Sequence, residues 1–503
     1  MLLAASTAFA AEVQVLSKVY TIDRKYRSME GPSSVQKVFL GNRTTAELVW
    51  ITGIRTDMVM EDGVTPQLPE LMCHVNVDLD ANLHQALFDL PRPVASRLMT
   101  LSQGMLAARL PPGYGFPVAS NEPLLLFTQV LNHNIEHPNN LKVRHRVTFD
   151  YVRDADLQQP MKPLFNLGAS GMVQLNVEDS RLRLSGQPGA AVLHDHGASC
   201  LIGQRAPQAM SSSADYVDPS GRHMTGHWIV PPGRQVNASD ITWFLNLPFT
   251  TKLHYAAVHL HPFAESLAVR DVTTGEYVLQ ARAANPAKGI GLTHVETFTS
   301  LKGVPMYPDH KYELVSTYNN TSTANADSMA SVFLGLDDLE FVRPASLARR
   351  SSALFDSGSV TVHTTAGDFT ALLARDAAPD TSIQVARLAL GGAFNRARTV
   401  SNGKEIHVTI AVTEPVRKLL EPTGGDRGLP LGPETIAYCY PSAAAYDVTL
   451  RVILGGRPAA DERCVGFARI GGGKNVLRAI HEAPAGVSAF VSSVETSQGP
   501  SSR

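Results

Sequence analysis

The stretch Leu-His-Tyr-Ala-Ala-Val-His-Leu-His, residues 253–261, is an apolar run interrupted only by histidines. A short apolar and aromatic run of this kind predicts a buried β-strand. Side chains alternate across a strand, so His259 and His261 are expected on one face, roughly 6.5–7 Å apart. Two imidazoles at this spacing can bind one metal ion. The alternative is a pair of packed or surface histidines that bind no metal.

A third ligand must come from another segment, and the best candidate is Met329. It follows the polar residues 325–328 and precedes the apolar, β-branched residues 330–334, a pattern that predicts a turn leading into a strand. Two imidazoles and a thioether favour copper, because the soft sulfur stabilises Cu(I) while nitrogen ligands accept both oxidation states.

Length and charge limit the classes of function that fit. The chain has 503 residues, which suggests three domains at roughly 150 residues each. It carries 44 basic and 46 acidic residues, a net charge of −2, and no long block of like charge. This balance excludes nucleic acid and anionic membrane surfaces as expected partners. After the first residues no segment approaches the roughly 20 continuous apolar residues of a membrane span.

The N-terminal residues and the cysteines indicate the compartment. Residues 1–10 are apolar and end in Ala8-Phe9-Ala10, which is typical of the remnant of a secretory signal peptide. We therefore expect a secreted or luminal protein. Acceptor tripeptides for N-glycosylation begin at Asn42, Asn237, Asn319 and Asn320. The four cysteines allow at most two disulfides, whose pairing the sequence leaves open; they are Cys73, Cys200, Cys439 and Cys464.

Short apolar or alternating runs, separated by Pro, Gly and Asn, extend from about residue 12 to 345 and predict antiparallel β-sandwiches. Two sandwiches fit this length better than one. The composition becomes linker-like near residue 346, and a new pattern begins near 360. The expected divisions are a signal remnant at 1–10, a first sandwich at 11–177, a second at 178–345 with an insertion at 178–222, a linker at 346–357, a third domain at 358–485 and a flexible tail at 486–503.

Several blocks between about residues 40 and 340 resemble the copper type II, ascorbate-dependent monooxygenases, in the family's order. They are residues 109–118, residues 229–238, His259-x-His261 and the turn into Met329. The resemblance implies two tandem jelly-roll-like sandwiches and two coppers. One copper, held by His259, His261 and Met329, would activate O2. The other, held by three histidines, would store an electron supplied by ascorbate.

The electron-storing site departs from the family pattern. Leu131 follows Gln129-Val130 where the family has histidine, and the family's adjacent histidine pair falls near Cys73 and His74. His133 and Cys73 are the candidates to complete a degenerate second site with His74. The favoured alternative is a packed strand without metal. We expect one copper ion, or two if His133 and Cys73 complete the second site. Ala257 replaces the arginine that grips a substrate carboxylate in the peptide-amidating members, so a C-terminal glycine substrate is not expected.

Two further histidine pairs are alternative copper or zinc ligands. His194 and His196 lie in the expected insertion, and His223 and His227, spaced i and i+4, lie next to it. Surface-loop positions are the favoured interpretation for both pairs.

Residues 358–482 resemble the cyclophilin-type peptidyl-prolyl isomerases in three ordered blocks, residues 360–369, 377–390 and 464–480. The resemblance implies an eight-stranded β-barrel with two helices. Arg396 occupies the position of the arginine that, in the family, hydrogen-bonds the prolyl amide and lowers its roughly 20 kcal/mol rotation barrier. A surface arginine is the equal alternative, because Ile406, Thr409 and Tyr438 replace the family's pocket residues.

Together these patterns predict a mainly β protein, with two antiparallel β-sandwiches followed by a cyclophilin-like barrel. Three functions remain open at this point. The first is an extracytoplasmic copper monooxygenase, and the second is a non-catalytic copper-binding or assembly protein whose barrel docks on a protein partner. The third is a residual prolyl isomerase.

Overall fold

The computed structural model describes residues 11–26, 30–43, 45–174, 215–355, 357–390, 394–401, 405–411, 426–439, 447–453, 464–483 and 491–498. The chain divides into two compact units. The N-terminal unit comprises Met1–Leu79 and Ala95–Phe341, and the C-terminal unit comprises Asp80–Val94 and Val342–Arg503.

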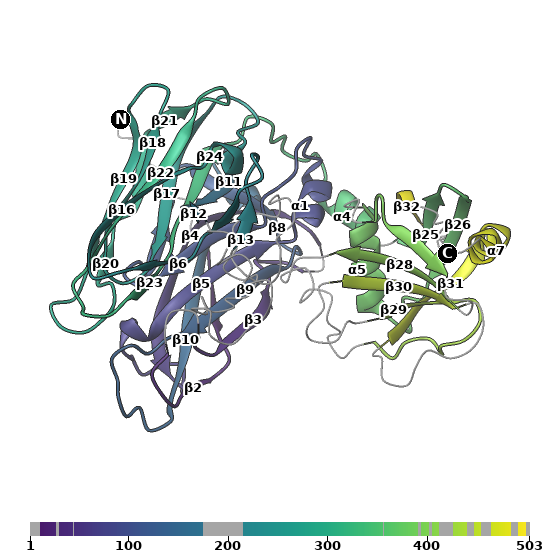
Figure 1. Cartoon of the computed structure of the whole chain (residues 1–503). Helices are drawn as coiled ribbons and strands as arrows, with labels where there is room; N and C mark the ends of the chain where they lie inside the picture. Colours follow the sequence, from purple (N-terminus) through teal and green to yellow (C-terminus); the bar gives the residue numbers. More distant parts are fainter. Residues whose placement is uncertain are drawn as a thin grey trace. The chain divides into compact units, whose positions relative to one another are not determined.

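The first half of the N-terminal unit is a β-sandwich, drawn in purple to blue in Figure 1. Its long strands are rich in Val, Ile, Thr and aromatic residues, which favour the pleated, half-buried surface of a sheet. Trp50, Phe116 and Phe149 are buried in it. One sheet contains, in order, β1 (Ala11–Leu16), β10 (Leu141–Arg153), β4 (Leu48–Met60) and β8 (Tyr114–Ala119), with β2 (Tyr20–Ile22) on β10 and β7 (Ala107–Arg109) on β4. The other contains β3 (Ser33–Val38), β9 (Leu124–Val130), β5 (Met72–Leu79) and β6 (Arg97–Ser102).

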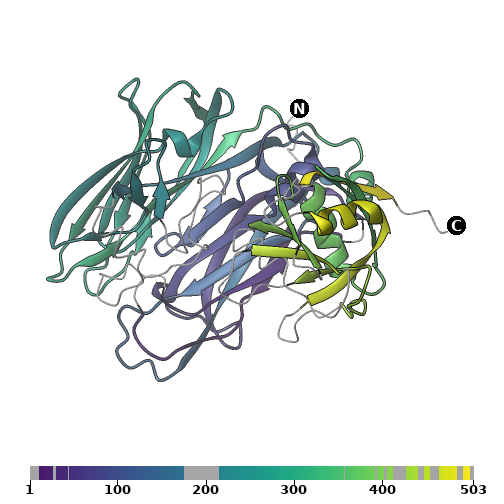
Figure 2. The ribbon, with the colours of Figure 1, turned by 45° about the vertical axis from the view of Figure 1, so that its right-hand side comes forward.

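The second half of this unit is a second sandwich, teal to green in Figure 2. One sheet contains β11 (Lys162–Ser170), β24 (Ala330–Asp337), β17 (Thr251–Leu260) and β21 (Phe298–Met306). The other contains β16 (Gly233–Asp240), β22 (Tyr312–Asn320), β18 (Ala264–Asp271), β19 (Tyr277–Ala284) and β20 (His294–Val295). Two small sheets complete it, β15 (Trp228–Val230) with β23 (Ala326–Ser328), and β12 (Val173–Gln174) with β14 (His223–Thr225) and β13 (Asp215–Val217).

The short helical elements of the N-terminal unit are η1 (Pro69–Leu71), η2 (Asp154–Asp156) and α3 (Thr242–Leu245).

A single strand joins the two sandwiches. β11 pairs antiparallel with β24 and parallel with β8, through Lys162↔Tyr114 and Pro163↔Gly115. One ten-stranded sheet therefore runs through both sandwiches. β17 contacts β6 of the first sandwich as well as its own neighbours. As a result, β17 is buried on both faces from Leu253 to Leu260.

The C-terminal unit is built on a curled eight-stranded sheet in the described part of the chain. Its order is β27 (Arg398–Ser401), β28 (Glu405–Ala411), β30 (Asp447–Ile453), β29 (Thr435–Cys439), β31 (Cys464–Gly472), β26 (Gly367–Leu373), β25 (Ser357–Thr364) and β32 (Val491–Gln498). The ends of the sheet meet, because Arg396 N–H donates to Val491 O and Val491 N–H donates to Ala397 O. Phe369, Phe394 and Phe467 pack inside the resulting barrel.

Four helices belong to the C-terminal unit in its described part. They are α1 (Ala81–Phe88), α4 (Leu347–Phe355), α5 (Pro379–Leu390) and α7 (Lys474–Glu482). α7 packs on β26, while α1 packs against both α4 and α5. The prediction of a mainly β protein built from several antiparallel sheets is confirmed.

The structure differs from the expected divisions at three places. Asp80–Val94 groups with the C-terminal unit, although it interrupts the first sandwich in sequence, because α1 packs on the helices of that unit. The expected linker contains α4. The expected flexible tail contains β32, which pairs with β25 and places the side chain of Val491 in the barrel core.

Two predicted segments lie outside or largely outside the described residues. The signal remnant at 1–10 is one, and most of the insertion at 178–222, with His194, His196 and Cys200, is the other. Within the described residues no helix is long and apolar enough to cross a bilayer.

Candidate metal centre

Strand β17 presents the His259-x-His261 pair. Both side chains are buried, and their ring centres lie 5.3 Å apart with the rings nearly perpendicular. The strand ends at Leu260, so His261 stands one residue beyond the last paired position. The backbone N–H of His261 donates to the hydroxyl of Tyr318 at 3.3 Å, which fixes the chain where it leaves the sheet.

Met329 lies between β23 and β24 and is only 2% exposed. The hydroxyl of Tyr318 donates to its backbone carbonyl. One tyrosine therefore bonds both to the Met329 carbonyl and to the His261 amide. The sulfur of Met329 lies 3.2 Å from Nε2 of His227.

From the sequence, His227 was an alternative copper or zinc ligand for which a surface-loop position was favoured. It is 2% exposed, and its ring stacks on that of His261 with 5.9 Å between centres. The pairing of β15 with β23 explains its place, because Trp228 lies opposite Ser328 and the next positions are His227 and Met329. His223, four residues earlier and paired with His227 in the sequence analysis, lies on strand β14 and is half-buried. The i, i+4 spacing therefore does not correspond to one face of a helix.

The first sandwich contributes His74, on β5, whose ring centre lies 6.2 Å from that of His259. Nδ1 of His74 lies 3.3 Å from the sulfur of Cys73, which is buried and forms no disulfide. Cys73 and Leu131 pack against Met329. The residues expected to form a separate second site therefore adjoin the first one.

His133 follows β9 and is buried enough that its pKa falls to about 4, with electrostatic contributions from His261 and Asp327. Oδ2 of Asp327 lies 3.1 Å from Nδ1 of His261. A carboxylate next to one imidazole nitrogen orients the ring and directs the other nitrogen elsewhere.

Five buried imidazole nitrogens in this region have no hydrogen-bond partner among the described residues. They are Nε2 of His74, Nδ1 of His133, Nδ1 of His259, and both nitrogens of His261, of which Nδ1 has the ion-pair contact with Asp327. A buried polar atom without a partner costs about 1–3 kcal/mol. A bound metal ion would relieve this cost for each nitrogen that it engages. We name His74, His133, His227, His259, His261 and Met329 the histidine-methionine cluster.

Burial keeps three of these imidazoles, those of His74, His133 and His259, neutral. Burial, with a smaller contribution from His261 and Arg97, lowers the pKa of His259 to about 3. Burial likewise lowers the pKa of His133 to about 4 and holds the pKa of His74 well below its usual range. Neutral imidazole is the form that binds a metal ion, so these side chains are ready to act as ligands at neutral pH.

The nitrogen and sulfur atoms of the histidine-methionine cluster do not converge on one point. In the described parts of the chain, no three His, Cys, Asp or Glu side chains are arranged to hold a metal ion together. The spacing of two rings can still be compared with that of two imidazoles on one ion. A bound imidazole nitrogen about 2 Å from a metal puts its ring centre about 3 Å away, so two rings at a tetrahedral angle lie about 5 Å apart. The rings of His259 and His261 at 5.3 Å, and of His227 and His261 at 5.9 Å, are close to this value.

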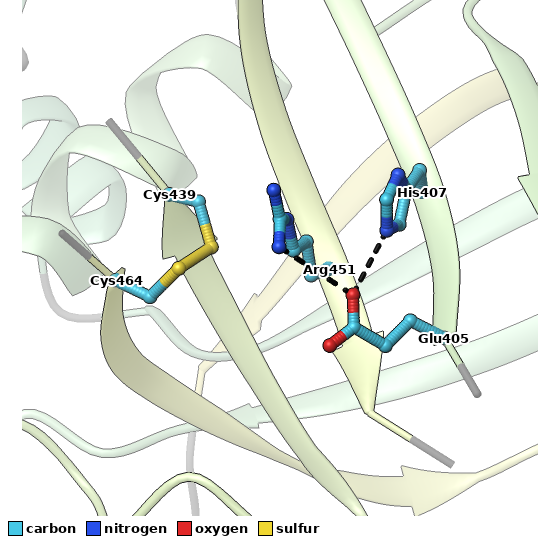
Figure 3. The surroundings of a disulfide bond; sticks show 5 residues. All are labelled: Glu405, His407, Cys439, Arg451 and Cys464. Atoms are coloured by element: carbon cyan, nitrogen blue, oxygen red, sulfur yellow. Dashed lines mark hydrogen bonds and ion pairs between the residues drawn. A yellow bond between two sulfur atoms is a disulfide. The ribbon is translucent and has the colours of Figure 1, made fainter. Parts of the chain in front are cut away.

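Arg396 lies in a different setting, in the C-terminal unit. Its side chain is exposed, and its backbone adopts a φ of 66°. Ile406 and Tyr438 point into the barrel core. The outer face nearby is charged: Nε2 of His407 lies 2.9 Å from a Glu405 carboxylate oxygen, and Arg451 lies 3.6 Å from the same oxygen (Figure 3).

The same face carries a disulfide that the sequence left open. Cys439 on β29 is bonded to Cys464 on β31, and the two residues are register partners on neighbouring strands (Figure 3). A cross-strand pair at directly opposed positions brings two sulfurs within bonding reach.

One of the candidate glycosylation positions is a structural residue. The side-chain amide of Asn320 is buried and donates to Val230 O at 2.9 Å and to Ala324 O at 2.8 Å. Its amide nitrogen is thus engaged in the folded protein.

Comparison with known proteins gives similarity of fold only. No protein-family model and no curated protein matches the chain. A cyclophilin-type peptidyl-prolyl cis-trans isomerase of Cryptosporidium parvum matches 29% of this chain and 99% of its own, with 13% identity and a TM-score of 0.23. The STIV MCP matches 66% of this chain and 98% of its own, with 8% identity and a TM-score of 0.27.

A peptide-N(4)-(N-acetyl-β-D-glucosaminyl) asparagine amidase matches 65% of this chain and 96% of its own, with 10% identity and a TM-score of 0.25. At such low identities and TM-scores, no conclusion about the activity of this chain follows from these structures. The resemblance to copper monooxygenases is not supported by these comparisons and stays a prediction.

Proposed function

We propose that this protein binds one copper ion in its N-terminal unit, at His259, His261 and Met329. The observation that carries the proposal is the buried pair of His259 and His261, whose ring centres lie 5.3 Å apart and whose rings each have an imidazole nitrogen without a hydrogen-bond partner among the described residues. A purely structural cluster would leave that cost uncompensated. A coordinated ion removes it for each nitrogen that it engages.

The mixture of donors favours copper over the other common metals. A thioether is a soft ligand that stabilises Cu(I), and imidazole suits both Cu(I) and Cu(II). Asp327 beside Nδ1 of His261 provides the carboxylate partner that metal-bound histidines usually have. It leaves Nε2 of that ring for the ion.

Hydroxylation of the monooxygenase type is a further step that we do not assign. One Cu(I) supplies one electron, so turnover with O2 would need more electrons from a reductant such as ascorbate. Leu131 stands where the family has a histidine ligand, and it packs against Met329 instead of framing a separate site. The proposal is therefore copper binding, with the electron-storing site absent.

The disulfide supports the expected extracytoplasmic location. Cys439 and Cys464 are bonded to each other, and such bonds persist mainly in oxidising compartments. A mixed His and Met site would hold copper in either the Cu(I) or the Cu(II) state.

Metal analysis tests the proposal directly. The purified full chain, loaded with copper and desalted, is expected to retain about one copper per chain, and His261→Ala is expected to retain little or none. His294→Ala is the matched control, because His294 is exposed on β20 and should leave the copper content unchanged. Equal copper in wild type and His261→Ala would disprove the proposal, as would wild type without copper.

The C-terminal unit has no catalytic step in this proposal. An isomerase needs an apolar pocket next to its arginine, whereas here the outer face of β28 carries Glu405 and His407. We expect the full chain to leave the rate of prolyl isomerisation in a test peptide at its uncatalysed value. Arg396→Ala should give the same rate. Faster isomerisation by wild type than by this variant would show that the activity survives.

A further inference from the structure

We infer that His227 is a positioning residue of the proposed copper site: its Nε2–H group donates to the sulfur of Met329 and holds the thioether in one orientation. The inference rests on the proposed function and leaves the ion with the ligands His259, His261 and Met329. The resemblance to the monooxygenases assigns no role to His227.

The β-sheet register places His227 against Met329. β15 and β23 pair antiparallel at Trp228↔Ser328, and the next position on each strand is His227 on one side and Met329 on the other. Both of these side chains are 2% exposed. The backbone N–H of His227 donates to Oγ1 of Thr225 at 3.2 Å, so the main chain that carries the ring is held as well.

The chemistry of the two groups fixes the direction of their hydrogen bond. Nε2 of His227 lies 3.2 Å from the sulfur of Met329. A thioether sulfur has no proton and can only accept, so Nε2 carries the proton and is the donor. A protonated ring nitrogen has no lone pair for a metal ion, which excludes Nε2 of His227 as a ligand in this arrangement. This agrees with the lack, in the described residues, of three His, Cys, Asp or Glu side chains placed to hold one ion.

Two hydrogen bonds hold Met329 at its opposite ends. The hydroxyl of Tyr318 donates to the backbone carbonyl of Met329, and His227 donates to the sulfur. A methionine side chain rotates about three bonds, and an unrestrained one loses that freedom when its sulfur binds an ion. Because Met329 is already held at the carbonyl and at the sulfur, part of this entropy is lost on folding and not on binding. The sulfur has a second lone pair, which remains for the ion.

The same hydrogen bond affects the oxidation state that the site prefers. The N–H dipole of His227 points its positive end at the sulfur. A positive partial charge near the ion disfavours Cu(II) more than Cu(I), because the repulsion grows with the charge of the ion. Hydrogen bonding around a ligand sulfur is one means by which proteins tune the reduction potential of copper. His227 is therefore expected to raise the reduction potential of the bound copper.

Histidine-ring NMR of the full chain tests the hydrogen bond itself. The metal-free wild type is expected to show the Nε2–H signal of His227, identified by its loss in His227→Gln. The signal should persist after loading with Cu(I), which is diamagnetic, whereas binding of Nε2 to the ion would remove the proton. Absence of this proton in the metal-free protein, or its displacement by Cu(I), would overturn the inference.

Copper competition and voltammetry test the positioning role. His227→Phe keeps a flat ring without an N–H donor, so it should hold Cu(I) about 10-fold more weakly in competition with bicinchoninate and lower the reduction potential. His227→Gln retains an N–H donor of similar reach and should keep both values close to those of wild type. Neither a ligand role nor a packing role of the imidazole predicts that rescue. His294→Ala, at an exposed position, is again the control.

The outcomes separate this inference from the proposed function. If wild type binds copper and His227→Phe matches it in affinity and in potential, His227 is not a positioning residue although copper binding stands. Wild type without copper removes both. Should His227→Phe fail to fold, as judged by circular dichroism of the metal-free protein, the wild-type ring spectra and His227→Gln still decide the question, because loss of copper by the glutamine variant would contradict the inference.

Discussion

Replacing Arg97 by methionine is expected to destabilise the N-terminal unit by about 3–5 kcal/mol. Arg97 on β6 bonds to the carboxylate of Asp78 on β5, and the two side chains are 5% and 4% exposed. Removing the guanidinium leaves a buried carboxylate without its counter-charge, and desolvation of an unpaired charge is among the most costly changes that a fold can suffer.

Tryptophan fluorescence during urea unfolding measures this effect in the full chain. The protein has three tryptophans, Trp50, Trp228 and Trp243, and all lie in the N-terminal unit, so the signal reports that unit alone. Arg24→Met is the matched control, because Arg24 pairs with Asp23 at the surface with 69% and 47% of the side chains exposed. Exposed pairs contribute about 0–1 kcal/mol.

A double variant separates charge from packing. Asp78→Asn combined with Arg97→Met removes both charges, and it should be clearly more stable than Arg97→Met alone, because no unpaired charge remains. If the single variant loses less than the surface control, the pair is not the electrostatic element that its burial implies.

The candidate site shows which features a sequence can reveal. Local patterns were sufficient for β17 and for β24, since alternation and apolar content act over a few residues. The turn expected at residues 325–328 was wrong, because Ala326–Ser328 form strand β23, which pairs with β15. His227 was only an alternative ligand with a surface position favoured, because its place depends on β15 pairing with β23, about 100 residues further along. No local signal encodes such a pairing.

The closeness of the residues assigned to two metal sites has a related reason. The resemblance suggested one site in each sandwich, but the relation between the sandwiches depends on the short parallel ladder of β8 and β11. With that link in place, His74 lies beside His259, and Leu131 lies against Met329. The geometry of two packed sheets follows from many weak contacts and cannot be read from any one motif.

In the C-terminal unit, too, local blocks were predicted while elements placed by long-range contacts were not. Its strand and helix blocks were predicted from ordered short patterns, whereas α1 was not expected there, because Asp80–Val94 lies between β5 and β6 in sequence. The polar composition of β32 also concealed a strand. Backbone pairing with β25 needs no apolar side chains beyond Val491 to anchor it.

Acidification is expected to weaken the metal-free N-terminal unit strongly, and His145 is the residue best suited to show it. His145 is fully buried, its Nε2 donates to Gln129 O at 3.1 Å, and its Nδ1 has no hydrogen-bond partner among the described residues. Burial lowers its pKa to about 4. A second proton would bind at Nδ1, and no described atom would accept a hydrogen bond from the resulting N–H group.

The sign follows from the two pKa values. Unfolded histidine has a pKa of about 6.5, so below that pH the unfolded state binds a proton that the folded state refuses, and stability falls as pH decreases. The loss approaches about 3 kcal/mol near pH 4, where folded His145 begins to protonate and the decline levels off. Urea midpoints from tryptophan fluorescence between pH 7 and pH 4 measure it. His145→Gln should flatten this dependence by about that amount, while His294→Gln, at an exposed position, should not. A variant whose stability falls as steeply as that of wild type would show that His145 is not held neutral, and the acid sensitivity would then belong to the histidine-methionine cluster alone.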